Sequence, residues 1–219
     1  MFSRLPPVTL ALLIANVALF LLLQLDGAYK PLMMHGALWP VWSGGVDAPE
    51  LHFQPWQLVT YAFLHADTSH IFFNMMTLVM FGAQLEHTFG HRRYSLYYAV
   101  CVIGAGLCQL ALASWSARNG GDLYPTIGAS GGVYGLLLAY GLLFPNQRVM
   151  LLIPPIPMKA RTLVIVFGVL ELALGFTGLQ PGVAHFAHLG GMLFGGLLLA
   201  YWHFGASRPP GPGRLRIVK

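Results

Sequence analysis

The chain alternates between long apolar runs and polar connections. Six apolar segments lie near residues 8–25, 71–86, 94–114, 130–144, 162–178 and 186–204. An apolar helix of about 20 residues crosses a bilayer, and flanking residues extend the shorter segments toward that length. The pattern therefore predicts an all-α, polytopic membrane protein whose six transmembrane helices form a single domain over residues 1–219. The stretch 26–69 becomes a long outer loop, and 206–219 a flexible tail.

Composition supports a membrane class and argues against nucleic acid as a partner. The chain has 219 residues, of which 56% are hydrophobic and 9% charged, whereas soluble domains carry about 25% charged residues. Its net charge is +5, but the basic residues are spread over short loops and the tail instead of forming a stripe with interleaved aromatic residues. Anionic lipid headgroups are the expected partner for them. The two cysteines form no zinc or disulfide pattern.

The loop charges predict the orientation, because cytoplasmic loops carry an excess of Lys and Arg. With both termini in the cytoplasm, ten of the twelve basic residues lie inside, and the outer side holds Lys30 and Arg118. The first apolar run has no convincing cleavage motif before Asp26, so we expect an uncleaved first span. The compact chain predicts a bacterial source, which places it in the inner (cell) membrane.

Polar residues open three of the predicted spans. Segments two, four and six all run from outside to inside, so their first residues share one depth in the outer leaflet. His70 and Asn74 begin the second segment, Ser130 the fourth, and His185 with His188 the sixth. Polar groups within spans are costly and usually face a bundle interior or a wet cavity, so we expect the three clusters to form one site.

The types of residue in these clusters suit acyl transfer. A serine hydroxyl such as that of Ser130 becomes nucleophilic when a base takes its proton, and His188 can be that base. His70 and Asn74 are four residues apart and lie on one helix face, where both can donate hydrogen bonds to a developing oxyanion. The backbone N–H of Ser130, near a helix start, is a third candidate donor.

Small residues predict close packing of segments four and six. Gly131 and Gly135 form one small-xxx-small pair, and Gly191 and Gly195 form another on the face of His188. Close approach of the two helices would bring His188 within hydrogen-bond reach of the serine.

Tyr134 completes the expected site, while a carboxylate and a metal ion are not expected in it. Tyr134 follows Ser130 by four residues, so its ring can pack against the imidazole of His188. No carboxylate is obviously available, since Glu171 lies mid-span with no assigned partner, and a Ser–His dyad is expected instead of a triad. His185 precedes His188 by three residues, but neither an HExxH motif nor a carboxylate pattern accompanies them, so we expect no metal.

Four stretches together are similar to one known family. They are PWQLVTYAFLH (55–65), HIFFN (70–74), GASGGVYG (128–135) and AHLGG with a following glycine (187–195). On these motifs the chain resembles the rhomboid family of intramembrane serine proteases, in their minimal six-span form. One departure is Trp56-Gln57, where some members have Trp-Arg, which leaves the anchoring of the outer loop open.

The resemblance implies a function and a role for each matching residue. The reaction would be hydrolysis of a peptide bond in or near a transmembrane segment of a membrane-protein substrate within the lipid bilayer, with no metal and no cofactor. Ser130 would be the nucleophile, His188 the base, His70 and Asn74 oxyanion stabilisers, and Tyr134 the residue stacked on the base. The expected supporting residues are Gly128, Gly131, Gly191, Gly195 and His185.

Alternatives remain at this point. His70 and Asn74 also suit a purely structural role between helices, and Tyr134 suits plain packing. A non-catalytic binder of transmembrane segments would keep the fold, although such family members lose the serine or the histidine. A small transporter would place its polar residues near the bilayer midplane, where this chain has Glu171 alone.

Overall fold

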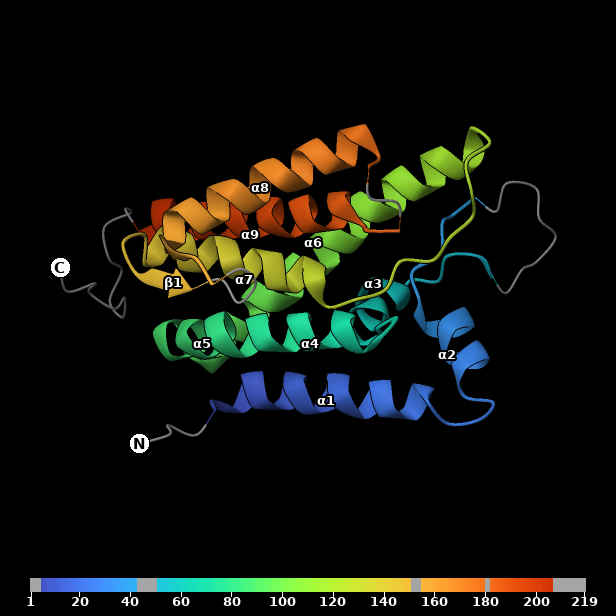
Figure 1. Ribbon diagram of the computed structural model, residues 1–219, viewed down its shortest axis with the longest axis horizontal. Coiled ribbons are helices and arrows are strands. Elements are labelled where there is room, and N and C mark those ends of the chain that lie inside the picture. The colour runs from blue at the N-terminus through green and yellow to red at the C-terminus, as the bar shows by residue number, and fades with distance from the viewer. Residues whose placement is uncertain (1–4, 43–50, 151–154, 180–181, 207–219) are drawn as a thin grey trace.

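The computed structural model describes residues 5–42, 51–150, 155–179 and 182–206. The expected tail beyond residue 206 lies outside these ranges, as do residues 43–50 of the expected outer loop. The described chain is mostly helical (Figure 1). Its long helical segments are α1 (Pro7–Leu23), α4 (Thr68–Thr77) continued by the π-helical η3 (Leu78–Gly82) and α5 (Ala83–Phe89), α6 (His91–Arg118), α7 (Ser130–Leu143), α8 (Ala160–Thr177) and α9 (His185–Ala206).

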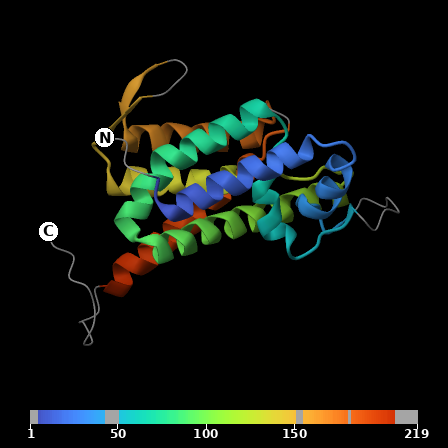
Figure 2. The same ribbon diagram turned by 90° about the horizontal axis from the view of Figure 1, so that it is seen from below.

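These segments match the positions of the six expected apolar runs, and they alternate in direction. The helices α4, α7 and α9 begin at one end of the bundle, on the right of Figure 1, where α1, α6 and α8 end. Helix α9 packs most extensively against α6 and α7, while α1 and α8 lie on opposite sides of the bundle. Figure 2 shows the same bundle from below, with α1 in front of the other helices. The starts of three helices are therefore gathered at one end.

Both long connections contain secondary structure. The expected outer loop holds α2 (Tyr29–Gly36), α3 (Gln57–Thr60) and the 3₁₀ turn η2 (Tyr61–Phe63). Between α7 and α8, the strands β1 (Arg148–Met150) and β2 (Pro157–Lys159) pair antiparallel, with Arg148 opposite Lys159. The fold is thus mostly helical but not strictly all-α as expected, because these two short strands lie in the connection between α7 and α8.

Two acidic residues fix helix starts. Asp67 precedes α4 and accepts a hydrogen bond from the His70 backbone N–H at 2.9 Å, which caps the helix. The buried Glu86 of α5 accepts bonds from the backbone N–H groups of Val8 and Thr9, at 2.9 and 2.7 Å. A carboxylate at a helix N-terminus is favourable because it meets unpaired N–H groups and the positive end of the helix dipole, so Glu86 joins α5 to the start of α1.

The segment that leads into α7 is tied to the expected outer loop. Leu38 and Thr126 form an isolated antiparallel bridge, with both backbone bonds at 2.9 Å. Two residues further on, the Gly128 N–H donates to the Tyr61 carbonyl at 2.9 Å, and the Tyr61 hydroxyl donates to the Val102 carbonyl at 2.8 Å in α6. These bonds hold the entry to α7, where Ser130 is the first helical residue.

The buried Gln57 anchors the same loop. Its side-chain oxygen accepts bonds from the backbone N–H groups of Trp39 at 3.2 Å and Gln54 at 3.1 Å, and the neighbouring Trp56 indole donates to the His35 carbonyl at 2.9 Å. Gln57 therefore anchors this loop through its own hydrogen bonds.

Candidate active site

Ser130 and His188 face each other at the end of the bundle where α7 and α9 begin. The His188 Nε2 atom lies 2.8 Å from the Ser130 Oγ atom, which is a hydrogen-bond distance. His188 is buried, with 7% of its surface exposed, while Ser130 is partly exposed. The structure thus brings together two residues that are 58 positions apart in the chain. A hydroxyl and an imidazole at this distance can exchange a proton.

His70 lies beside the same serine, across Gly128. A Cβ atom added at Gly128 would be 2.7 Å from the His70 Nε2 atom and 3.6 Å from the Ser130 Oγ atom, and the backbone there has φ +122°, a region that strongly favours glycine. The Ala66 backbone N–H donates to His70 Nδ1 at 3.4 Å, so the hydrogen of a neutral ring belongs on Nε2. That hydrogen faces the space next to the serine.

Asn74 is buried one turn further along α4. Its side-chain nitrogen donates to the His70 carbonyl oxygen at 3.1 Å. One of the two amide hydrogens is therefore committed to the helix itself, and the second remains for another acceptor. The structure thus places His70 beside Ser130, and Asn74 one helical turn further along α4.

Tyr134 is stacked on the imidazole of His188, as its spacing from Ser130 predicted. The two ring centroids are 4.2 Å apart and the planes differ by 6°. Its hydroxyl donates to the Glu171 Oε1 atom of α8. Tyr134 thus touches the imidazole with its face and an acidic residue with its hydroxyl.

The expectation that no carboxylate is available was wrong. Glu171 Oε2 lies 2.9 Å from His188 Nδ1 and 2.6 Å from His185 Nδ1. The contact with His185 is an aligned hydrogen bond. The Nδ1 atom of His188 is close to Oε2, but the direction of this contact is not that of a hydrogen bond. His188 Nδ1 therefore has no aligned hydrogen-bond partner among the described residues. Because Oε2 lies so near both rings, we treat the His188 contact as a charge-assisted interaction.

The same three residues could also hold a metal ion. One donor atom from each of Glu171, His185 and His188 lies within 4.8 Å of the others, and all three residues are buried. The expectation of no metal rested partly on the lack of a carboxylate, and that premise fails. The direct contacts of 2.6 and 2.9 Å nevertheless already occupy the Glu171 oxygen, so an ion would have to separate these groups.

The predicted glycine faces do bring α7 and α9 together, with one difference. A Cβ atom at Gly191 would overlap the Gly131 carbonyl oxygen, and one at Gly135 would lie 3.1 Å from the Gly191 carbonyl oxygen. Gly195 instead faces the Tyr97 hydroxyl of α6. The expected four-glycine contact is therefore a three-glycine contact between α7 and α9, with the fourth glycine turned toward α6.

His65 precedes α4 and supports the ring of His70. Its ring meets the His70 ring edge-on, with the centroids 4.9 Å apart. The residue is 2% exposed, and neither ring nitrogen has a described hydrogen-bond partner. Burial, with a smaller contribution from His70, lowers the pKa of His65 to about 4. At neutral pH His65 is therefore an uncharged support for the His70 ring.

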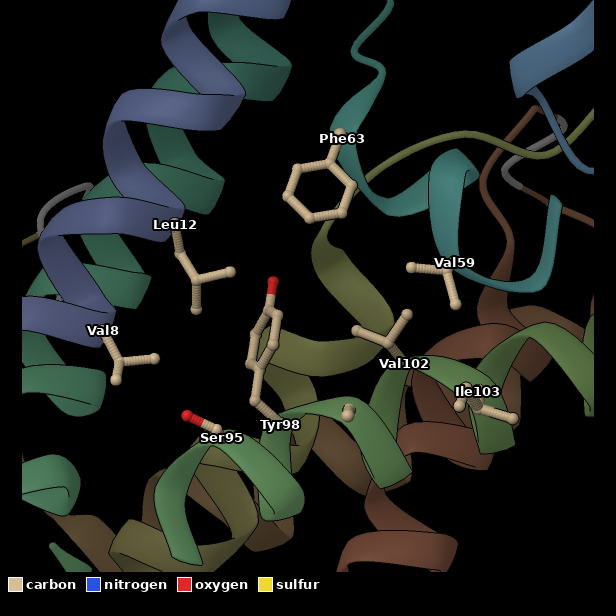
Figure 3. Close-up of a pocket in the computed structure, with 9 residues that line it drawn as sticks. Val8, Leu12, Val59, Phe63, Ser95, Tyr98, Val102 and Ile103 are labelled. Atoms are coloured by element: carbon tan, nitrogen blue, oxygen red, sulfur yellow. The ribbon is translucent and has the colours of Figure 1, made fainter. Parts of the chain in front are cut away.

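A pocket formed by the described residues lies away from this cluster. A cavity of about 260 Å³ is formed by α1, η2 and α6, with Leu12, Phe63 and Val102 among its lining (Figure 3). The Tyr98 hydroxyl points into it and has no described hydrogen-bond partner. None of the lining residues belongs to the cluster around Ser130.

Comparison with known proteins decides the family. The family model of the Rhomboid domain matches residues 52–205, which includes every residue of the cluster. The chain belongs to the rhomboid family. Since its helices are also strongly apolar, this rhomboid is an integral membrane protein. Two described helices, α6 and α8, are long and apolar enough to cross a bilayer, and α1 and α7 are shorter apolar helices.

Named relatives come from plants and bacteria. The chain is 31% identical over 194 residues to RHOMBOID-like protein 4 of Arabidopsis thaliana, covering 84% of this chain and 45% of that protein. It is 29% identical over 201 residues to Rhomboid protease GlpG of Yersinia pestis (strain Pestoides F), covering 91% of this chain and 64% of that protein. The rhomboid chain thus spans less than two thirds of either relative.

Proposed function

We propose that the chain is an intramembrane serine endopeptidase that cleaves peptide bonds in or near transmembrane segments of membrane-protein substrates. The observation that carries the proposal is the 2.8 Å contact between Ser130 Oγ and His188 Nε2. Membership of the rhomboid family and the similarity to a relative named as a protease support it. No cofactor takes part in the proposed reaction.

The proposed reaction has two stages. Ser130 Oγ attacks the carbonyl carbon of the peptide bond while His188 Nε2 takes the hydroxyl proton, which gives a tetrahedral oxyanion. The oxyanion accepts hydrogen bonds from the Ser130 backbone N–H and from His70 Nε2–H, with Asn74 behind them. The C–N bond breaks, and the amine leaves with the proton held by His188. In the second stage, His188 takes a proton from water, the water oxygen attacks the acyl carbon, and the C–O bond to Ser130 breaks as Ser130 Oγ regains a proton.

The same proposal places the chain across the membrane. It takes the six helical segments as spans and both termini as cytoplasmic, in a bacterial inner membrane, because the basic residues gather at the ends where α1 and α6 begin. Ser130 and His188 then lie below the outer surface, and water reaches them from that side.

The test is a cleavage assay on the purified chain in lipid vesicles. The substrate is a reporter protein with one transmembrane segment that contains small, helix-breaking residues. Ser130→Ala and His188→Ala should each reduce cleavage by at least about 1,000-fold, and a fluorophosphonate probe should label the wild type but not Ser130→Ala. Ser116→Ala, on α6, is the matched control and should cleave normally.

The result also separates the alternatives. A non-catalytic binder would capture the reporter equally well with or without Ser130 and would not react with the probe. Cleavage that persists in Ser130→Ala would contradict the proposal outright.

A further inference from the structure

We infer that Glu171 is a positioning residue for His188, which makes the competence of the Ser130–His188 pair depend on how α8 is seated. This inference rests on the proposed function and extends it, since a dyad alone needs no acidic residue. Glu171 comes from α8, whereas Ser130 and His188 come from α7 and α9.

The chemistry of a carboxylate determines which nitrogen of a neighbouring imidazole carries the hydrogen. An ionised carboxylate accepts hydrogen bonds and donates none, so the groups that it contacts must turn their hydrogens toward it. Oε2 faces Nδ1 of His185 at 2.6 Å and Nδ1 of His188 at 2.9 Å. A neutral His188 ring that carries its hydrogen on Nδ1 leaves Nε2 free to accept the proton of Ser130, 2.8 Å away. The opposite tautomer would point a hydrogen at the serine and could not act as the base.

Glu171 also has three polar neighbours in the site. Its Oε1 accepts from the Tyr134 hydroxyl, and its Oε2 is hydrogen-bonded to His185 Nδ1 and lies in close contact with His188 Nδ1. Tyr134 is in turn stacked flat on His188, with 6° between the planes. The carboxylate therefore fixes the imidazole both at its edge, through Nδ1, and at its face, through the tyrosine. Positioning groups of this kind are worth about 10- to 100-fold in function when they support a metal-bound histidine.

The burial pattern of α8 also singles out Glu171. The buried residues of this helix are Ala160, Leu163 and Val164, near its start, and Glu171. Its other residues in the half that lies near Ser130 are exposed or half-exposed, including Val169, Leu170 and Leu172. In that half, Glu171 is the buried residue that carries the polar contacts to α7 and α9, while Gly175 and Phe176 add apolar contacts with Phe186 of α9. A shift of α8 away from α7 and α9 would thus remove the carboxylate from His188 at the same time.

The experiment replaces Glu171 in the full chain, in vesicles. Glu171→Leu removes both acceptor oxygens at similar volume, Glu171→Gln keeps one acceptor oxygen without charge, and Glu171→Asp keeps the carboxylate one methylene shorter. The control is Leu172→Ala, an exposed neighbour on α8. Three readouts are used: kcat and KM on the reporter, the fluorophosphonate labelling rate, and ¹⁵N NMR of the imidazole nitrogens, with His188 assigned by its loss in His188→Ala.

A positioning role predicts a defined set of results. Glu171→Leu should lower kcat about 100-fold or more while KM stays within about twofold, and its His188 signals should move from the Nδ1–H tautomer toward a mixture with Nε2–H. Glu171→Asp should recover about a tenth or more of the wild-type kcat, and Leu172→Ala should behave as the wild type.

Other results would overturn the inference. These are a kcat within about threefold of the wild type in Glu171→Leu, or a lower kcat with the His188 tautomer unchanged. If Glu171→Leu does not fold, the same comparison between Glu171→Gln and Glu171→Asp decides. If the wild type neither cleaves the reporter nor labels at Ser130, the proposed function fails, whereas the tautomer comparison still reports on Glu171 by itself.

Discussion

Gly191 of α9 lies against the carbonyl oxygen of Gly131 in α7, so closely that a side chain on Gly191 would overlap that oxygen. This contact sets the separation of the two helices that carry Ser130 and His188. Because the obstacle is backbone and not the end of a flexible side chain, the helices cannot adjust locally.

Gly191→Ala should therefore disturb both stability and the site. Overpacking typically costs about 1–3 kcal/mol, and a small misplacement of reacting groups can cost about 100-fold in rate. We expect a lower unfolding temperature in detergent and a fluorophosphonate labelling rate at least about tenfold lower. The matched variant is Gly196→Ala, in which the added Cβ atom would lie 3.3 Å from its nearest neighbour, the Leu138 Cδ2 atom. Equal effects of the two substitutions would contradict this explanation.

The two contacts of Tyr134 can be separated by mutation. Tyr134→Phe keeps the ring that stacks on His188 and removes the hydroxyl that donates to Glu171. Tyr134→Leu removes both. Since a ring stack is worth about 0.5–1.5 kcal/mol, Tyr134→Leu should cleave up to about tenfold more slowly than Tyr134→Phe. The check is kcat on the reporter for both variants, and identical values would mean that the stack does not orient His188.

Stability should decrease in mild acid because of His65. Its pKa in the folded chain is about 4, whereas an unperturbed histidine has a pKa of about 6.5. Between these values the unfolded chain binds more protons than the folded chain, so the free energy of unfolding falls as the pH is lowered. The shift corresponds to roughly 3 kcal/mol between pH 7 and pH 4.

The measurement for His65 is chemical unfolding of detergent-solubilised protein from pH 7 to pH 4. His65→Leu should flatten the pH dependence relative to the wild type. His87→Leu, at an exposed position on α5, should leave it unchanged. A wild-type slope retained in His65→Leu would show that other groups are responsible.

Gln57 should be needed for the order of the loop that precedes α4. Gln57→Leu would leave the backbone N–H groups of Trp39 and Gln54 without their shared acceptor, and an unpaired buried donor costs about 1–3 kcal/mol. We expect a loss of stability of that size and faster proteolytic cleavage within the loop. Gln24→Leu is the control, since Gln24 is exposed and bonds only to its own helix among the described contacts. Equal protease resistance in both variants would argue against the anchoring role.

The pairing of Ser130 with His188 could be predicted from the sequence. Apolar runs alternate in direction across a bilayer, so polar residues at the starts of alternate runs had to meet at one end. The spacing of four residues likewise placed Tyr134 on the face of Ser130, and the glycine pairs predicted the approach of α7 to α9. Gly195 was misplaced because a glycine face does not reveal which neighbouring helix it meets.

The contacts of Glu171 could not be predicted from the sequence. Helix α8 is apolar on all sides, so its pattern does not reveal how it is rotated about its own axis. Glu171 and His185 are 14 positions apart, with a turn between them whose path the sequence does not reveal. The partners of Glu86 are hidden for a similar reason. Its oxygens bond to Val8, Thr9 and His91, and the first two are more than 70 positions away, so proximity in sequence does not reveal them.

The bridge between Leu38 and Thr126 has a consequence for any molecule that approaches from the side of α2. Both hydrogen bonds of the bridge are 2.9 Å long, and Ser130 lies four residues after Thr126. A ligand that displaces Leu38 outward would therefore also displace the segment that leads from Thr126 to the Ser130 hydroxyl. A ligand that binds at this edge could therefore act on the position of Ser130 from outside the candidate active site.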